Sequence, residues 1–201
     1  MLIKICGLKF SKDIQVCEEI GADFLGFIFH PASSRYVEPE TVSALPRTGA
    51  MRVGVFVRQD VEEVKAIMQR AGLDIAQLHG DYSPKDCGQI GSERVSKVFW
   101  PERYTDLNSF NRELELYREY CRYFLFDAGT RGGGHGKPIR NDLLSKMSPD
   151  IPWFLAGGVT PENLEKLLKQ YSPDGIDLNS GVEKAPGDKD EDKLRAIKDC
   201  L

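Results

Sequence analysis

The sequence predicts an α/β protein built as a single (β/α)₈ TIM barrel, one domain over residues 1–201. Short apolar runs alternate with amphipathic stretches at a spacing of about 25 residues, which is typical of consecutive strand and helix units. Several runs, such as Phe24 to Phe29, are almost continuously apolar, as strands buried on both faces are. The first run ends in Cys6-Gly7-Leu8-Lys9 and lacks the Gly-x-Gly-x-x-Gly turn of an open nucleotide-binding sheet, which favours the barrel.

The pattern predicts eight strands, each followed by a helix. The predicted strands are Leu2 to Cys6, Phe24 to Phe29, Met51 to Val57, Asp74 to His79, Arg94 to Trp100, Arg122 to Asp127, Ile151 to Ala156 and Gly175 to Leu178. The predicted helices are Lys12 to Ile20, Pro39 to Ala44, Val61 to Ala71, Ser83 to Ile90, Leu107 to Tyr120, Arg140 to Lys146, Pro161 to Gln170 and Lys189 to Cys200. Ser83-Pro84 and Thr160-Pro161 carry the cap and proline signals of helix starts. Asp188 to Lys193 is expected to be a solvated helix start.

Length and composition fit an ordinary soluble protein. A barrel typically needs about 250 residues, so this chain of 201 is expected to have short loops and no second domain. Hydrophobic residues make up 41% and charged residues 29%, with a net charge of −4, so no nucleic-acid partner is expected. No run approaches the roughly 18 apolar residues of a membrane span, and the N-terminus does not resemble a signal peptide. We therefore expect no membrane partner and a cytoplasmic location.

The five cysteines are odd in number, widely separated and never arranged as a Cys-x-x-Cys pair. This spacing indicates neither a disulfide framework nor a zinc site. Cys17, Cys87, Cys121 and Cys200 are expected to be small buried hydrophobic residues in a reducing compartment.

Polar residues at the C-terminal ends of the predicted strands are the first candidates for function, because barrel active sites lie at that face. Cys6, Asp127 and Asp177 stand there. Asp127 precedes a glycine-rich run, residues 129–136, that could fold over a ligand, or it could cap the next turn. Cys6 could be a buried small residue, or a general base if its surroundings favour the thiolate.

Two glycine-containing loops predict a phosphate site. Gly157-Gly158 follows the seventh predicted strand and Ser180-Gly181 follows the eighth. These are the loops in which barrels commonly bind phosphate through backbone amides, and glycine lets the backbone approach the anion closely. Each pair alone could be an ordinary turn, but both together at these positions favour phosphate binding.

Motifs along nearly the whole chain resemble those of the phosphoribosylanthranilate isomerase family. The matching segments are Lys4-Ile5-Cys6-Gly7, Phe29 to Val37, Val53 to Val57, Gln77-Leu78-His79-Gly80, Phe126-Asp127-Ala128, Leu155 to Asn163, Ser180-Gly181-Val182-Glu183 and Gly187 to Asp190. Their combination is far more specific than any one of them. The sequence departs from the family pattern at His135, where Thr is usual, and at Asn179, where Ser is usual.

The resemblance implies an Amadori rearrangement of N-(5'-phosphoribosyl)anthranilate to 1-(o-carboxyphenylamino)-1-deoxyribulose 5-phosphate in tryptophan biosynthesis. It implies Cys6 as general base, Asp127 as general acid, Arg35 as partner of the anthranilate carboxylate, Asp177 at the sugar or its nitrogen, and Gly157, Gly158, Ser180 and Gly181 at the phosphate. Two proton-transfer groups suffice for this chemistry, so neither a cofactor nor a metal is expected. The expected partner is thus a phosphorylated aminosugar substrate.

Other interpretations stay open at this point. The histidine-pathway aminosugar isomerase performs the same rearrangement with two Asp residues, and Cys6 argues against it. A barrel that binds phosphosugars without catalysis is a second alternative, which retention of Cys6 and Asp127 disfavours. His135 is expected to be a solvated loop residue. His79 ends the fourth predicted strand and could face the pocket, although a packing or hydrogen-bonding role is expected for it. Strand order predicts that Cys6 and Asp127 flank the mouth without bonding to each other, with the phosphate loops on the arc between them.

Overall fold

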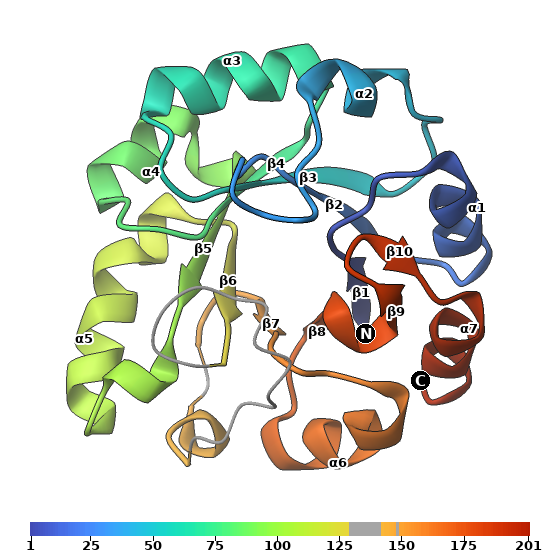
Figure 1. The fold of residues 1–201 in the computed structure, drawn as a ribbon. Helices are drawn as coiled ribbons and strands as arrows, with labels where there is room; N and C mark the ends of the chain where they lie inside the picture. Colours follow the sequence, from blue (N-terminus) through green and yellow to red (C-terminus); the bar gives the residue numbers. More distant parts are fainter. Residues whose placement is uncertain (129–141, 148) are drawn as a thin grey trace.

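The computed structural model describes residues 1–128, 142–147 and 149–201, and within them it contains the predicted closed barrel. The parallel strands are β1 (Leu2–Ile5), β2 (Phe24–Ile28), β3 (Met51–Phe56), β4 (Ile75–Leu78), β5 (Val95–Phe99), β6 (Tyr123–Phe126), β7 (Trp153–Leu155) and β8 (Gly175–Leu178). They pair in sequence order, and β1 closes the barrel against β8 with Leu2 opposite Gly175. Figure 1 looks into this ring of strands, with the helices around it. The (β/α)₈ prediction is confirmed.

The α-helices are α1 (Ser11–Glu19), α2 (Pro39–Ala44), α3 (Val61–Ala71), α4 (Pro84–Ile90), α5 (Leu107–Tyr117), α6 (Pro161–Tyr171) and α7 (Glu191–Asp199). Single 3₁₀ turns are η1 (Ser92–Arg94), η2 (Pro101–Arg103), η3 (Arg118–Tyr120), η4 (Leu144–Lys146) and η5 (Ser180–Val182). The predicted capping signals act as expected, because Ser83 and Asp86 form a capping box and Thr160 precedes Pro161 at the start of α6. None of the described helices is long and apolar enough to cross a membrane.

The structure corrects two predicted helices. The described part of the helix predicted at 140–146 holds only the 3₁₀ turn η4, and residues 129–141, which include His135, lie outside the described residues. The last helix begins at Glu191 and not at Lys189, because Asp188–Lys189 forms strand β10 of a hairpin with β9 (Glu183–Ala185). Lys189 is therefore buried and is not part of a solvated helix start.

The core has two parts, one outside the strands and one inside the barrel. Apolar side chains on the outer faces of the strands pack against the helices. Inside, Phe24, Tyr123 and Phe154 meet edge to face, with ring centroids 5.3 to 5.6 Å apart. This aromatic layer lies toward the N-terminal ends of the strands and fills the barrel there. It leaves the C-terminal face for polar side chains.

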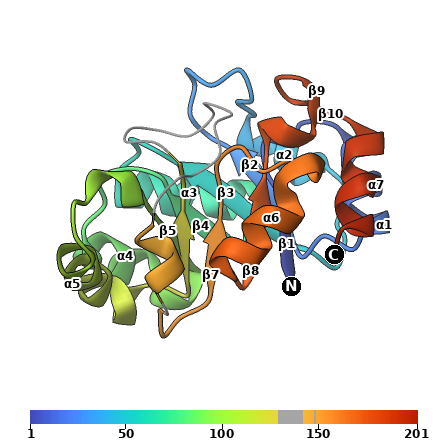
Figure 2. The same ribbon diagram turned by 90° about the horizontal axis from the view of Figure 1, so that it is seen from below.

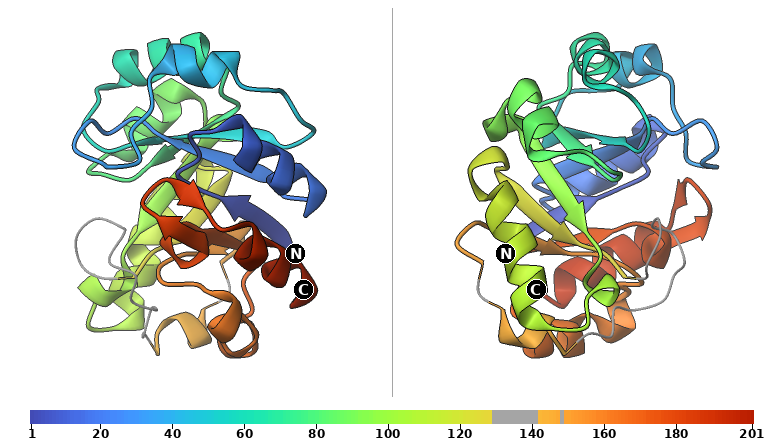
Figure 3. Two further views of the ribbon diagram at one scale, coloured as in Figure 1. Left: turned by 45° about the vertical axis from the view of Figure 1, so that its right-hand side comes forward. Right: turned by 90° about the vertical axis from the view of Figure 1, so that its left-hand side faces the viewer.

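The segments that follow the strands gather at one end of the barrel. Figure 2 shows the chain after β2 and the β9–β10 hairpin rising at the same end. In the ring of helices around the barrel, α7 packs between α1 and α6 and buries Leu194 and Ile197 completely (Figure 1). The two chain ends lie close together in every view (Figure 3).

Candidate active site

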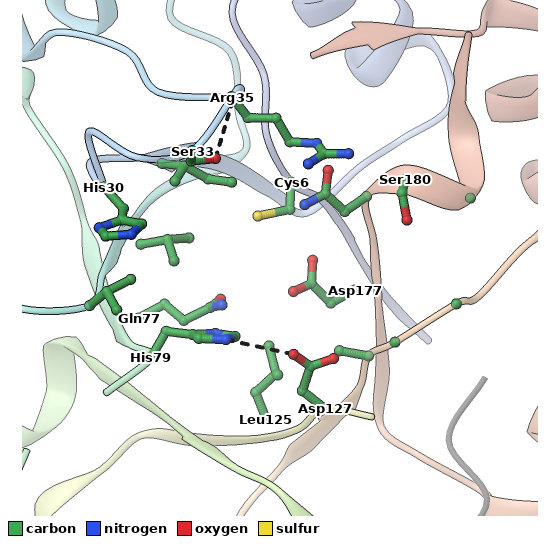
Figure 4. Close-up of a pocket in the computed structure, with 18 of the residues that line it drawn as sticks. Cys6, His30, Ser33, Arg35, Gln77, His79, Leu125, Asp127, Asp177 and Ser180 are labelled. Atoms are coloured by element: carbon green, nitrogen blue, oxygen red, sulfur yellow. Dashed lines mark hydrogen bonds and ion pairs between the residues drawn. The ribbon is translucent and has the colours of Figure 1, made fainter. Parts of the chain in front are cut away.

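A cavity of about 440 Å³ opens at the C-terminal face, and every predicted site residue lines it. These are Cys6, Arg35, Asp127, Gly157, Gly158, Asp177, Ser180 and Gly181, joined by His30, Gln77 and His79. Figure 4 shows Cys6 and Asp127 on separate sides of the cavity, with Asp177 between them. Among the described residues no hydrogen bond joins Cys6 to Asp127, as the strand order predicted, and the two glycine loops after β7 and β8 lie on the arc between β6 and β1.

Strand β1 and the residue that follows it supply two inward-facing polar groups, Lys4 and Cys6, because residues two apart point to the same face. Lys4 is buried and its Nζ donates to Asp177 Oδ1 at 2.8 Å. Gly26 of β2 makes room for the thiol, because a Cβ at this glycine would stand 2.8 Å from the Cys6 sulfur. The thiol therefore lies on the cavity wall beside a buried ion pair.

Opposing effects act on the Cys6 thiol. Burial raises its pKa, and the Lys4 ammonium opposes that shift by charge and by a hydrogen bond, while the Asp177 carboxylate adds to it. The net pKa is raised. For Lys4 itself, burial disfavours the ammonium, but Asp177 and Cys6 outweigh this effect and raise the pKa of Lys4. Lys4 is thus charged and favours the Cys6 thiolate more than Lys189 does.

Asp127 follows β6 and is buried on the cavity wall. Its Oδ1 accepts from the backbone N–H of Ala128 at 2.9 Å. His79 Nε2 lies 3.7 Å from Asp127 Oδ2, marked in Figure 4, which is too long for a hydrogen bond. Burial lowers the pKa of His79 to about 4, with Lys4 and Lys97 adding to the shift. A neutral imidazole therefore faces the carboxylate.

Arg35, after β2, makes contacts that its predicted role did not include. Its Nε donates to Glu183 Oε1 at 2.9 Å, and its Nη2 donates to Glu183 Oε2 at 2.6 Å. Lys189 Nζ also donates to Glu183 Oε1 at 2.9 Å, and its side chain is fully buried. Burial alone would raise the pKa of Glu183, but Arg35 and Lys189 hold it below its ordinary value.

The two glycine loops have the backbone geometry that a phosphate site needs. Gly157 and Gly158 adopt φ of 91° and 62°, a region that side chains disfavour. A Cβ on Gly181 would overlap the carbonyl oxygen of Val159, so the loops after β7 and β8 pack in direct contact. Within the described residues, the backbone N–H groups of Gly157, Gly158, Ser180 and Gly181 donate to no protein acceptor. Asn163 of α6 secures the first loop by donating to the Gly158 carbonyl at 2.8 Å.

The residues that sequence reasoning did not assign are Lys4, Gln77, Glu183 and Lys189. A charged residue inside an apolar strand was the available signal for Lys4, because it shares the inward face with Cys6. Gln77 is buried on the cavity wall, and its Oε1 accepts no hydrogen bond from the part of the chain that the structure describes. Among those same residues, no cluster of three or more His, Cys, Asp or Glu side chains could hold a metal ion.

The closed barrel and the polar cavity at its C-terminal face define the class of the protein, a (β/α)₈-barrel enzyme. The sequence matches the N-(5'phosphoribosyl)anthranilate (PRA) isomerase family over residues 3–199. The chain belongs to this family.

Relatives and solved structures agree over the full length. The N-(5'-phosphoribosyl)anthranilate isomerase of Maridesulfovibrio salexigens is 43% identical, with 98% of this chain and 96% of the relative covered. The phosphoribosyl anthranilate isomerase structure from Thermus thermophilus superposes with a TM-score of 0.87 at 35% identity, covering 100% and 98% of the two chains. A further isomerase structure, in complex with reduced 1-(o-carboxyphenylamino)-1-deoxyribulose 5-phosphate, has a TM-score of 0.81 at 31% identity, covering 98% and 97%.

Proposed function

We propose that this chain isomerises N-(5'-phosphoribosyl)anthranilate to 1-(o-carboxyphenylamino)-1-deoxyribulose 5-phosphate, with Cys6 and Asp127 as its two proton-transfer groups. The observation that carries the proposal is their placement. A thiol and a carboxylate from β1 and β6 face one cavity without bonding to each other, and the two glycine loops lie on the arc between them. Each group can therefore act on a different part of one bound sugar.

In the first step, Asp127 in its acid form protonates the furanose ring oxygen. The bond between carbon 1 and that oxygen breaks, and the nitrogen lone pair forms the iminium. Cys6 as thiolate then removes the proton from carbon 2, and the electrons of that bond give the enolamine. The enolamine gains a proton at carbon 1 and loses one from the carbon 2 hydroxyl, which yields the ketone.

The remaining predicted residues place the substrate. Free N–H groups on the loops of Gly157-Gly158 and Ser180-Gly181 suit a phosphate, and an isomerase of the same fold binds a reduced phosphorylated product. Arg35 would face the anthranilate carboxylate, and Asp177, held by Lys4, would contact the sugar or its nitrogen. The phosphate and the carboxylate would thus anchor the two ends of the molecule.

The direct test is turnover of freshly prepared N-(5'-phosphoribosyl)anthranilate, followed by the loss of its anthranilate fluorescence. The Cys6→Ala and Asp127→Asn variants should fold and yet lose at least about 10²-fold in kcat, because each lacks one proton-transfer group. Near-wild-type turnover in either variant would contradict that residue's role. Binding without turnover in the unaltered protein would contradict the reaction itself.

A further inference from the structure

The Arg35 guanidinium is held by a protein carboxylate, although its proposed task is to bind a substrate carboxylate. Glu183 engages both Nε and Nη2 of Arg35 and is itself buried. Among the described residues, Nη1 has no hydrogen-bond partner. A pair of one guanidinium and one carboxylate has no net charge, so Arg35 and Glu183 alone would attract a second carboxylate weakly.

Lys189 contacts this pair through Glu183 and does not line the cavity. Its Nζ lies 2.9 Å from Glu183 Oε1, 3.2 Å from Asn179 Oδ1 and 3.4 Å from the Asn179 carbonyl oxygen. Three oxygens around one nitrogen match an ammonium, which has three N–H donors and no acceptor. A neutral amine would have only two N–H groups for them. Burial lowers the pKa of Lys189, and the Glu183 carboxylate opposes that shift by its charge and by the hydrogen bond. The arrangement of the three oxygens fits the charged form of Lys189.

The hairpin fixes the two charges relative to each other. Glu183 in β9 stands opposite Lys189 in β10, and Gly187 in the turn adopts a φ of 83°. The backbone N–H of Gly187 also donates to Glu183 Oε1, at 3.0 Å. The hairpin follows directly after Ser180 and Gly181, so the same segment carries the phosphate loop and these charges.

We propose that Lys189 restores a net positive charge to the Arg35–Glu183 pair and thereby makes the cavity select an aminosugar whose aromatic ring bears a carboxylate. Arg35, Glu183 and Lys189 together carry one net positive charge, and only Arg35 of the three lines the cavity. Lys189 is thus a positioning and specificity residue that acts through its neighbours. The inference rests on the role of Arg35 in the proposed function.

The test compares two substrates, N-(5'-phosphoribosyl)anthranilate and the same aminosugar built on aniline, which lacks the carboxylate. The readout is the ratio of their kcat/KM values. Lys189→Met removes the charge and keeps the length of the side chain, and we expect it to lower the ratio roughly tenfold or more. Glu183→Gln combined with Lys189→Met restores one net positive charge on Arg35, and we expect most of the preference to return.

The outcomes separate this inference from the proposed function. The inference is overturned if Lys189→Met lowers kcat/KM equally for both substrates, or if the double variant fails to regain the preference for the carboxylate. A merely structural role of Lys189 predicts either result. Arg35→Met should also lower the ratio. If it leaves the ratio unchanged, the carboxylate-binding role of Arg35 is wrong. If Arg35→Met lowers the ratio and Lys189→Met does not, only the inference fails. Should Lys189→Met not fold by circular dichroism, Lys189→Gln replaces it in both variants.

Discussion

Lys4 lies inside the barrel and opposes the rise in the pKa of the Cys6 thiol. Burial and Asp177 raise the pKa of Cys6, and Lys4 opposes them. Lys4→Met should therefore raise that pKa further and move the ascending limb of the kcat/KM profile to higher pH. A shift of one pKa unit would lower kcat/KM about tenfold near neutrality.

Alkylation of the thiol checks this prediction without substrate. Cys200, which was expected to be buried, is exposed, and a Cys200→Ser background removes it. Cys6 is buried like Cys17, Cys87 and Cys121, but its thiol lies on the wall of the cavity. The pH at which iodoacetamide modifies Cys6 should rise in the Lys4→Met protein, as located by mass spectrometry. An unchanged alkylation profile would mean that Lys4 serves only to hold Asp177.

His79 makes the stability of the protein depend on pH. Burial lowers its pKa from 6.5 to about 4, so the unfolded chain binds a proton between these values and the folded protein does not. The stabilisation is complete above pH 6.5 and is lost as pH falls toward 4, by up to about 3 kcal/mol. Urea unfolding at pH 7 and 4.5 should show a smaller loss for His79→Gln than for the unaltered protein. If the free energy of unfolding falls equally in both proteins, His79 is not the source of this pH dependence.

Single residues were predictable where position in the barrel determines their exposure to the cavity. Cys6 and Asp127 end predicted strands, Asp177 lies one residue before the end of its strand, and strand ends meet at one face. Lys4 was not, because a charge is tolerated in the interior only beside a partner, and the partner of Lys4 is distant in sequence. Asp177 lies 173 residues from Lys4, and no local pattern reveals that pairing.

At the scale of elements, the contact between the loops after β7 and β8 leaves no room for a larger residue at Gly181. Gly181→Ala would force a methyl group onto the Val159 carbonyl and move these loops apart. We expect the inhibition constant of inorganic phosphate to rise about tenfold, the loss of roughly one hydrogen bond to a charged group. Gly49→Ala is the matched control, since nothing lies within 4 Å of its Cβ position. If inorganic phosphate inhibits the two variants equally, the phosphate does not bind at these loops.

Strands and helices were predictable to within one to three residues wherever their periodic pattern is long. The helix α3, with Asp60 as its N-cap and Gly72 as its left-handed C-cap, begins and ends as expected. The β9–β10 hairpin was not predicted, because strands of three and two residues are too short for alternation to be recognised. Lys189 was consequently assigned to the helix that follows.

Across the whole molecule, the outer shell should affect stability and leave the chemistry unchanged. Leu194 of α7 is completely buried against the neighbouring helices. Leu194→Ala should cost about 2–5 kcal/mol in urea unfolding, while kcat below the unfolding transition stays constant. Arg195→Ala is the control on the same helix, because its partners Glu19 and Glu191 are exposed and its loss should change neither quantity appreciably. A fall in kcat with Leu194→Ala would show that α7 communicates with the mouth of the barrel.

The layer formed by Phe24, Tyr123 and Phe154 gives the reaction chamber a floor. Because these rings fill the barrel on its N-terminal side, substrate enters and product leaves through the opening of the cavity at the C-terminal face. Product must therefore leave the cavity before the next substrate molecule can bind. Product and substrate must compete for the free enzyme, and added product should raise the apparent KM while the limiting rate stays the same.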